Sequence, residues 1–221
     1  MSKNKSVQWS FSSLKDFIGC PKRYYEVKVV KNFESKVTEA ITYGKEVHTA
    51  LEEYVRDGKA LPVNYQRFQK MVDELKAIDG DKLVEHEMAL LPDRTPCAFD
   101  DPKRWVRGIA DLLIVNGDTA WVVDYKTGSD RFADADQLKL MALMAFAHYP
   151  SVQKVKGALL FVLKNTLITE DYTREQIDLL WESFIPKLKR LELSYSTNEW
   201  VENPSPLCRF CPVTSCHYNR I

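Results

Sequence analysis

The sequence lacks the features that mark a membrane or secreted protein. No stretch approaches the roughly 18 consecutive apolar residues of a membrane span. The opening segment MSKNKSVQWSFSS has no apolar core of the kind that a signal peptide needs. Internal repeats and low-complexity tracts are also absent, and the 45% apolar and 28% charged residues exclude a disordered, collagen-like or coiled-coil protein. We therefore expect a cytoplasmic globular protein, in a compartment where disulfides are rare.

The chain has no net charge either. Its 31 Lys and Arg residues balance 31 Asp and Glu residues, so the total charge indicates no partner. Residues 1–36, however, hold eight basic and three acidic residues, a charge of +5, which leaves −5 on the rest of the chain. A basic arm on an acidic body favours a polyanionic partner.

A length of 221 residues suits one domain. A chain of this size buries roughly 70% of its unfolded surface, so it needs no disulfides to hold a core. We predict a single domain over 1–221, made of a basic helical segment (1–36), a core (38–194) and a cysteine-rich tail (195–221).

Apolar residues recur at helical spacing in five segments. The first helix is expected to begin at Ser12 or Ser13 as N-cap, and Pro186 should kink or restart the last one. The other helices are predicted at 38–56, 65–77, 135–148 and 173–193.

The middle of the chain has short segments rich in Val, Ile and Leu, which predict strands. Asn116-Gly117-Asp118 is a strong hairpin signal between two of them. The strands are expected at 82–91, 105–115, 120–126 and 156–163. This order predicts an α/β fold with a mixed central sheet flanked by helices.

Two of these strands carry charged residues among apolar neighbours. Strand alternation places Asp124 and Lys126 on one face, and the hairpin can bring Asp111 beside Asp124. Buried carboxylates need compensation, which a divalent cation would give, and a lysine beside it could stabilise developing negative charge. From these three residues alone, a solvent-facing Asp–Lys ion pair explains the pattern equally well.

The longer pattern resembles the RecB-like branch of the PD-(D/E)XK nuclease superfamily, and this resemblance implies a restriction-endonuclease-like core. The family's Q-x-x-x-Y motif is matched only in part, because Gln137 is followed by Met141. The matching motifs are S-x-S-x-L at 10–14, C-P-x-x-Y at 20–24, G-x-x-x-H at 44–48, G-x-x-D at 108–111 and V-V-D-Y-K-T-G at 122–128.

The resemblance also implies roles for single residues. Asp111 and Asp124 would be metal ligands, with the main-chain carbonyl of Tyr125 as a third and His48 as a further one. A histidine imidazole among oxygen ligands would make Mn²⁺ a suitable ion in addition to Mg²⁺. Considered by itself, His48 is equally a satisfied histidine of the core.

Three more residues follow from the same family pattern. Lys126 would be the catalytic lysine and Gln137 an orienting residue. Glu87 resembles the acidic residue that some members carry before the hairpin strands, although a surface glutamate at a strand end fits that position as well.

Five cysteines remain to be explained. Cys208, Cys211 and Cys216 are clustered in the tail, Cys20 lies far upstream and Cys97 has no partner in its loop. The spacing is typical of a metal site and leaves zinc, an iron–sulfur cluster and free thiols open. The resemblance to AddB-type and CRISPR-associated RecB-like exonucleases implies a 4Fe–4S cluster on Cys20 and the three tail cysteines, joining the two ends of the chain.

Taken as a whole, the resemblance implies a metal-dependent DNA nuclease, most similar to exonucleases that act on single-stranded ends. Such an enzyme would act alone or in a larger recombination, repair, phage or CRISPR-adaptation assembly. Aromatic and basic residues around Cys20 are typical of single-stranded DNA sites, although such rings also serve as core. Two alternatives remain: a non-catalytic DNA-binding or adaptor protein on the same fold, and a small-molecule metal hydrolase, which the basic arm disfavours.

Overall fold

The computed structural model describes residues 7–130 and 134–220. The chain forms two compact units. The larger one spans residues 39–181, and the smaller one combines residues 1–38 with residues 182–221. No helix in the described ranges is both long enough and apolar enough to cross a membrane.

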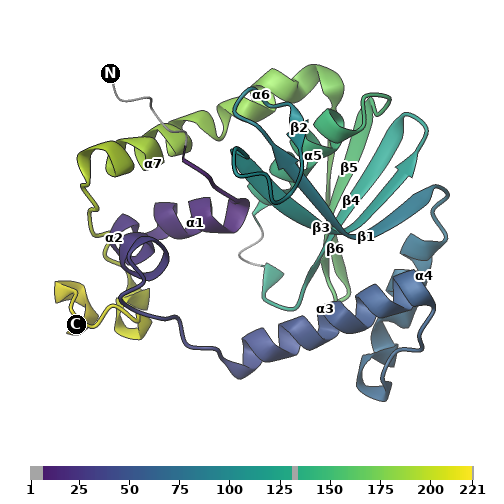
Figure 1. Ribbon diagram of the computed structural model, residues 1–221. Helices are drawn as coiled ribbons and strands as arrows, with labels where there is room; N and C mark the ends of the chain where they lie inside the picture. Colours follow the sequence, from purple (N-terminus) through teal and green to yellow (C-terminus); the bar gives the residue numbers. More distant parts are fainter. Residues whose placement is uncertain (1–6, 131–133, 221) are drawn as a thin grey trace. The chain divides into compact units, whose positions relative to one another are not determined.

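A six-stranded sheet forms the centre of the larger unit (Figure 1). Its order is β2-β1-β3-β4-β5-β6, and only β4 and β5 run parallel; helix α5 (Ala135–His148) connects them. The strands are β1 (Asp81–Leu90), β2 (Pro96–Cys97), β3 (Val106–Asn116), β4 (Thr119–Lys126), β5 (Lys154–Phe161) and β6 (Thr166–Thr173). The predicted mixed α/β sheet is confirmed, and the sequence missed the two edge strands, β2 and β6.

The predicted hairpin joins β3 and β4. Asn116 pairs with Thr119, and Gly117 between them has φ of +60°. This left-handed backbone suits the tight two-residue turn, because glycine carries no Cβ to clash.

Helices cover both faces of the sheet (Figure 1). On one face lie α3 (Glu39–Asp57), the 3₁₀ segment η2 (Val63–Phe68) and α4 (Gln69–Lys76). Their apolar stripe packs on alternate residues of the central strands, as the helical spacing predicts. This core includes Val47, Leu51, Phe68, Val72, Leu112, Ile114, Val123 and Tyr125.

Helix α5 covers the opposite face and is buried from Leu138 to Phe146 except at Lys139. Arg174 binds carbonyls at the C-terminal end of α5, where helical partners are lacking, and in the loop that follows. The Arg174 guanidinium donates to the carbonyls of Phe146, Tyr149 and Val152 at 2.7–2.9 Å. Helix α6 (Ile177–Glu182) follows and marks the boundary of the unit.

The smaller unit begins with α1 (Phe11–Gly19), which starts earlier than expected. Its N-cap is Ser10, not Ser12 or Ser13. The Ser10 hydroxyl accepts the N–H of Ser13 at 3.3 Å, while the Ser13 hydroxyl bonds back to the Ser10 N–H at 2.8 Å. This reciprocal capping box fixes the first turn.

Short helical segments make up the rest of this unit. They are α2 (Pro21–Tyr24), the π-helix η1 (Tyr25–Val29), α7 (Ile185–Thr197), η5 (Pro206–Phe210) and η6 (His217–Arg220). Pro186 lies in the first turn of α7, so the predicted restart of the last helix is confirmed.

The two ends of the chain are joined inside the smaller unit by hydrogen bonds and aromatic rings. The Lys22 N–H donates to the Val201 carbonyl at 3.1 Å, and the Asn203 amide donates to the Gly19 carbonyl at 2.9 Å. Trp200 packs against rings of the N-terminal segment, namely Phe17, Tyr24 and Tyr25.

The structure does not show the expected cluster of Cys20, Cys208, Cys211 and Cys216 in the described ranges. A group of three or more potential ligand atoms within 4.8 Å occurs there once, and it contains no cysteine. The sulfurs of Cys20 and Cys208 instead accept N–H groups within their own turns, at 3.5 and 3.3 Å. A tetrahedral zinc with Zn–S bonds of about 2.3 Å needs thiolates about 3.8 Å apart. The structure therefore does not show a zinc site formed by the cysteine sulfurs in the described ranges.

Candidate active site

The site forms where β3 and β4 separate. Their pairing runs from Asn116 and Thr119 to Leu112 and Val123, and Asp111 and Asp124 occupy the next positions. There the Tyr125 N–H donates to Asp111 Oδ2 at 2.6 Å. A carboxylate thus takes the place of a ladder carbonyl, and it is oriented by the backbone.

The strand on the other side of β3 is distorted at the same level. Glu85 lies opposite Asp111, between the pairs Val84–Leu112 and His86–Ala110, and has φ of +49°. A non-glycine residue in this conformation is strained, and such residues cluster at functional sites.

The side-chain alternation changes across this distortion. Leu112 and Gly108 are four residues apart on β3, so a regular strand would point them to the same face. Leu112 instead belongs to the core under α3, whereas Gly108 lies against Met141 and Met144 of α5. The distortion therefore turns the Asp111 carboxylate toward α3.

Helix α3 brings His48 to this carboxylate. His48 Nδ1 lies 3.4 Å from Asp111 Oδ2. Burial alone would lower the pKa of His48, but the hydrogen bond to Asp111 and its charge raise it above the ordinary value. Gly44, one turn earlier, allows this approach, because a Cβ there would lie 3.1 Å from Thr127 Oγ1.

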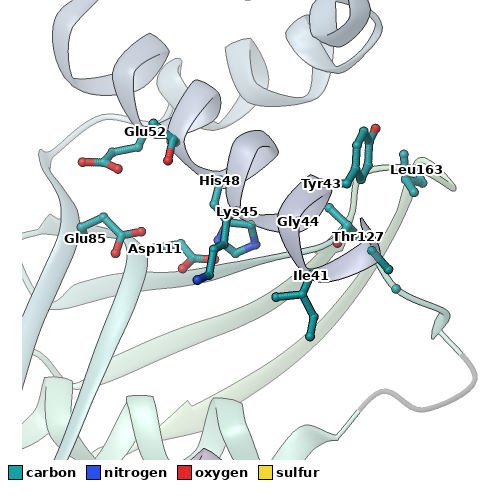
Figure 2. A pocket seen from close by; sticks show the side chains of 13 residues that line it. Ile41, Tyr43, Gly44, Lys45, His48, Glu52, Glu85, Asp111, Thr127 and Leu163 are labelled. Atoms are coloured by element: carbon teal, nitrogen blue, oxygen red, sulfur yellow. The ribbon is translucent and has the colours of Figure 1, made fainter. Parts of the chain in front are cut away.

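His48, Glu85 and Asp111 each offer a ligand atom within 4.8 Å of the others. Figure 2 shows the three converging beneath α3, with Glu52 beside them. They line a cavity of about 730 Å³. Burial and the nearby charges of Asp111 and Glu52 raise the pKa of Glu85. One imidazole and two carboxylates form a donor set that suits Mn²⁺ or Mg²⁺.

A second polar group lies at the end of β4. Lys126 Nζ is 2.6 Å from Asp124 Oδ2 and donates to Gln137 Oε1 at 2.9 Å, while the Gln137 amide donates to Asp124. Asp124 is only 7% exposed. Burial, followed by the charge of Asp111, raises the pKa of Asp124 to about 6, although Lys126 acts in the opposite direction.

The structure thus brings His48 and Asp111 together and places Asp124, Lys126 and Gln137 in one hydrogen-bonded group. It brings Glu85 to the ligand group, whereas Glu87 is exposed two residues further along β1. The sequence V-E-H-E contains both glutamates, and only the backbone distortion at the first distinguishes them. Met141, at the position of the family's tyrosine, is 3% exposed and fills the space above Gly108.

Comparison with known proteins identifies the class of fold. A family model described as the PD-(D/E)XK nuclease superfamily matches residues 8–216. The chain belongs to this superfamily, and it is a nuclease by family.

One similar solved structure is a Eubacterium rectale protein provisionally named an exonuclease. It is 15% identical, with a TM-score of 0.55 over 99% of this chain and 90% of that one, and the likeness supports the fold. The protein SSO0001 is 13% identical, with a TM-score of 0.45 over 96% and 86% of the two chains, too low for an argument. No curated protein matches the sequence.

Proposed function

We propose that the protein is a metal-dependent deoxyribonuclease that hydrolyses phosphodiester bonds, acting as an exonuclease on single-stranded DNA ends. The observation that carries the proposal is the convergence of His48, Glu85 and Asp111 in a cavity beside the Asp124–Lys126–Gln137 group. The name of the Eubacterium rectale protein supports the exonuclease assignment.

The side chains divide into ligands and positioning groups. His48, Asp111 and Glu85 would hold a divalent cation, with Asp124 and the Tyr125 carbonyl at the adjoining strand end. The bound cation would polarise the phosphodiester and lower the pKa of the attacking water. The Tyr125 N–H keeps the Asp111 carboxylate in its orientation before substrate arrives.

Lys126 supplies positive charge beside the ligand group. Its ammonium would stabilise the negative charge that develops on the phosphoryl oxygens. Gln137 accepts from Lys126 and donates to Asp124, so it fixes the relative position of these two side chains.

A 4Fe–4S cluster on Cys20, Cys208, Cys211 and Cys216 is the second part of the proposal. Its support is that all four cysteines belong to the smaller unit. Two of the sulfurs already accept backbone N–H groups, and hydrogen bonds of this kind tune bound thiolates.

We further propose that the enzyme acts in the cytoplasm, alone or within a larger assembly for recombination, repair, phage or CRISPR-adaptation processes. The family membership and the basic N-terminal arm support DNA as the partner.

The test is a cleavage assay on end-labelled single-stranded and double-stranded DNA with Mn²⁺, Mg²⁺ or a chelator. We expect stepwise shortening of single strands with either metal and none with chelator. Asp111→Ala should abolish cleavage, and Lys126→Ala should slow it by about 10²-fold. DNA binding without cleavage by the wild-type protein would instead identify the non-catalytic alternative.

A further inference from the structure

Part of the sheet face around the active site is open to solvent. Helix α3 covers β3 at Leu112 and Ile114, but the strand continues past Asp111 toward Val106. On this extension Ile109 is 39% exposed, and Arg107 is exposed as well.

Arg107, Ile109 and Asp111 lie on one face of β3. The pairing with β1 is continuous from Val106 to Ala110, so Arg107 and Ile109 point away from the α5 face on which Gly108 lies. The distortion turns the Asp111 carboxylate to the same side, toward α3. The open face is therefore continuous with the ligand group.

Arg107 is held in a defined orientation. Its guanidinium lies over the ring of Phe99, 5.0 Å from the ring centroid. A guanidinium stacked on a ring keeps its N–H groups at the rim, where they can bind a phosphate in a bidentate manner. Arg104, three residues earlier, instead directs its guanidinium to the Asp101 carbonyl.

The separation from the site sets the length of substrate that Arg107 can contact. Four residues of strand span about 13 Å. A stacked DNA strand rises about 3.4 Å per nucleotide, so this span corresponds to about four nucleotides, or fewer in an extended strand.

We propose that Arg107 binds a backbone phosphate two to four nucleotides from the scissile bond, with Ile109 beneath the intervening sugars and bases. The occupant of the open face is thus the continuation of the DNA strand that is cut. This inference rests on the proposed nuclease function. Glu87, which pairs with Ile109 and is exposed, adds an opposing charge to the same face.

The first experiment measures binding of a labelled single-stranded 12-mer by fluorescence anisotropy between 50 and 200 mM salt. Arg107→Gln should weaken binding about three- to tenfold and reduce the slope of log K against log salt by about 0.7, as for one lost phosphate contact. Glu87→Gln should strengthen binding. Lys154→Gln is the matched control, because it removes one exposed charge at the start of β5, the far end of the sheet.

The second experiment separates binding of the strand from chemistry at the metal. Arg107→Gln should lower kcat/KM for the 12-mer but leave it unchanged for the p-nitrophenyl ester of thymidine 5′-phosphate, which is too short to reach Arg107. Phe99→Leu should weaken 12-mer binding in the wild-type background and have no further effect beside Arg107→Gln, because the ring acts through the guanidinium. Equal melting temperatures of the variants would exclude a general loss of structure.

The outcomes distinguish the inference from the proposed function. If wild type cleaves both substrates and Arg107→Gln binds and cuts the 12-mer as wild type does, only the assignment of the open face is wrong. An equal loss of activity on the ester and the 12-mer would also overturn it. A wild-type protein that neither binds nor cuts DNA would overturn both.

Discussion

Asp124 is predicted to destabilise the metal-free protein at neutral pH. Its pKa is raised from 3.8 to about 6 in the folded state, mainly by burial. A carboxyl group with a raised folded pKa contributes most stability below its unfolded pKa and loses it as pH rises through the folded pKa. The loss between pH 4 and pH 7 amounts to about 3 kcal/mol, at about 1.4 kcal/mol per pH unit. Asp124→Asn removes this titration, so its stability relative to wild type should rise by about that amount over the same interval.

Urea denaturation in the presence of chelator, at half-unit steps from pH 4 to pH 8, measures this difference. The ion pair with Lys126 forms only when Asp124 is ionised, so its opposing effect is already contained in the net pKa and in the pH dependence of the wild type. Asp171→Asn, an exposed residue of β6, is the control and should run parallel to wild type. If the free energy of unfolding of Asp124→Asn and of wild type changed with pH in parallel, the pKa of Asp124 would not be raised by burial as argued. Cleavage should be lost in Asp124→Asn at every pH.

Three further predictions concern other parts of the chain. Gly108→Ala should lower the free energy of unfolding by about 1–2 kcal/mol by overpacking, since its Cβ would lie 2.4 Å from the terminal methyl of Met141. Adding Met141→Leu should restore much of the melting temperature. Additive effects of the two substitutions on stability would contradict the contact. Mn²⁺ at about 100 times its Kd should stabilise wild type by about 2.7 kcal/mol in thermal melts; Glu85→Gln should diminish this effect, and a matching loss in Glu87→Gln would contradict the ligand group. Purified wild-type protein should contain about four iron and four sulfide per chain, and Cys211→Ser should contain neither. An iron-free wild-type protein with reactive thiols would contradict the proposed cluster.

The spacing of apolar residues along the sequence predicted most helices and strands of the larger unit. Helix α5 has the predicted bounds, because Asp134 caps its start and an apolar sequence continues to His148. Strand β6 was missed because it is an edge strand with exposed, largely polar side chains, including Glu170 and Asp171, so it shows little of the alternation that marks a half-buried strand.

Different reasons limited the prediction of the site. Asp111, Asp124 and Lys126 could be found because charged residues within apolar strands are conspicuous. Glu85 could not be distinguished from Glu87, because the difference lies in a backbone φ that depends on pairing with β3. The start of α1 was misplaced for a similar reason: Ser10, Ser12 and Ser13 are chemically alike, and only the reciprocal hydrogen bonds select the first.

The composition of the smaller unit has a consequence for protein synthesis. Phe17 of α1 is 1% exposed, and one of its ring partners is Trp200, which follows it by more than 180 residues. At 5–20 residues per second, a ribosome needs roughly 10–40 s to supply that partner. During this interval the larger unit can complete its sheet, while the apolar face of α1 stays exposed. A released fragment that ends near residue 181 should therefore resist protease within the sheet but be cleaved in its first helix.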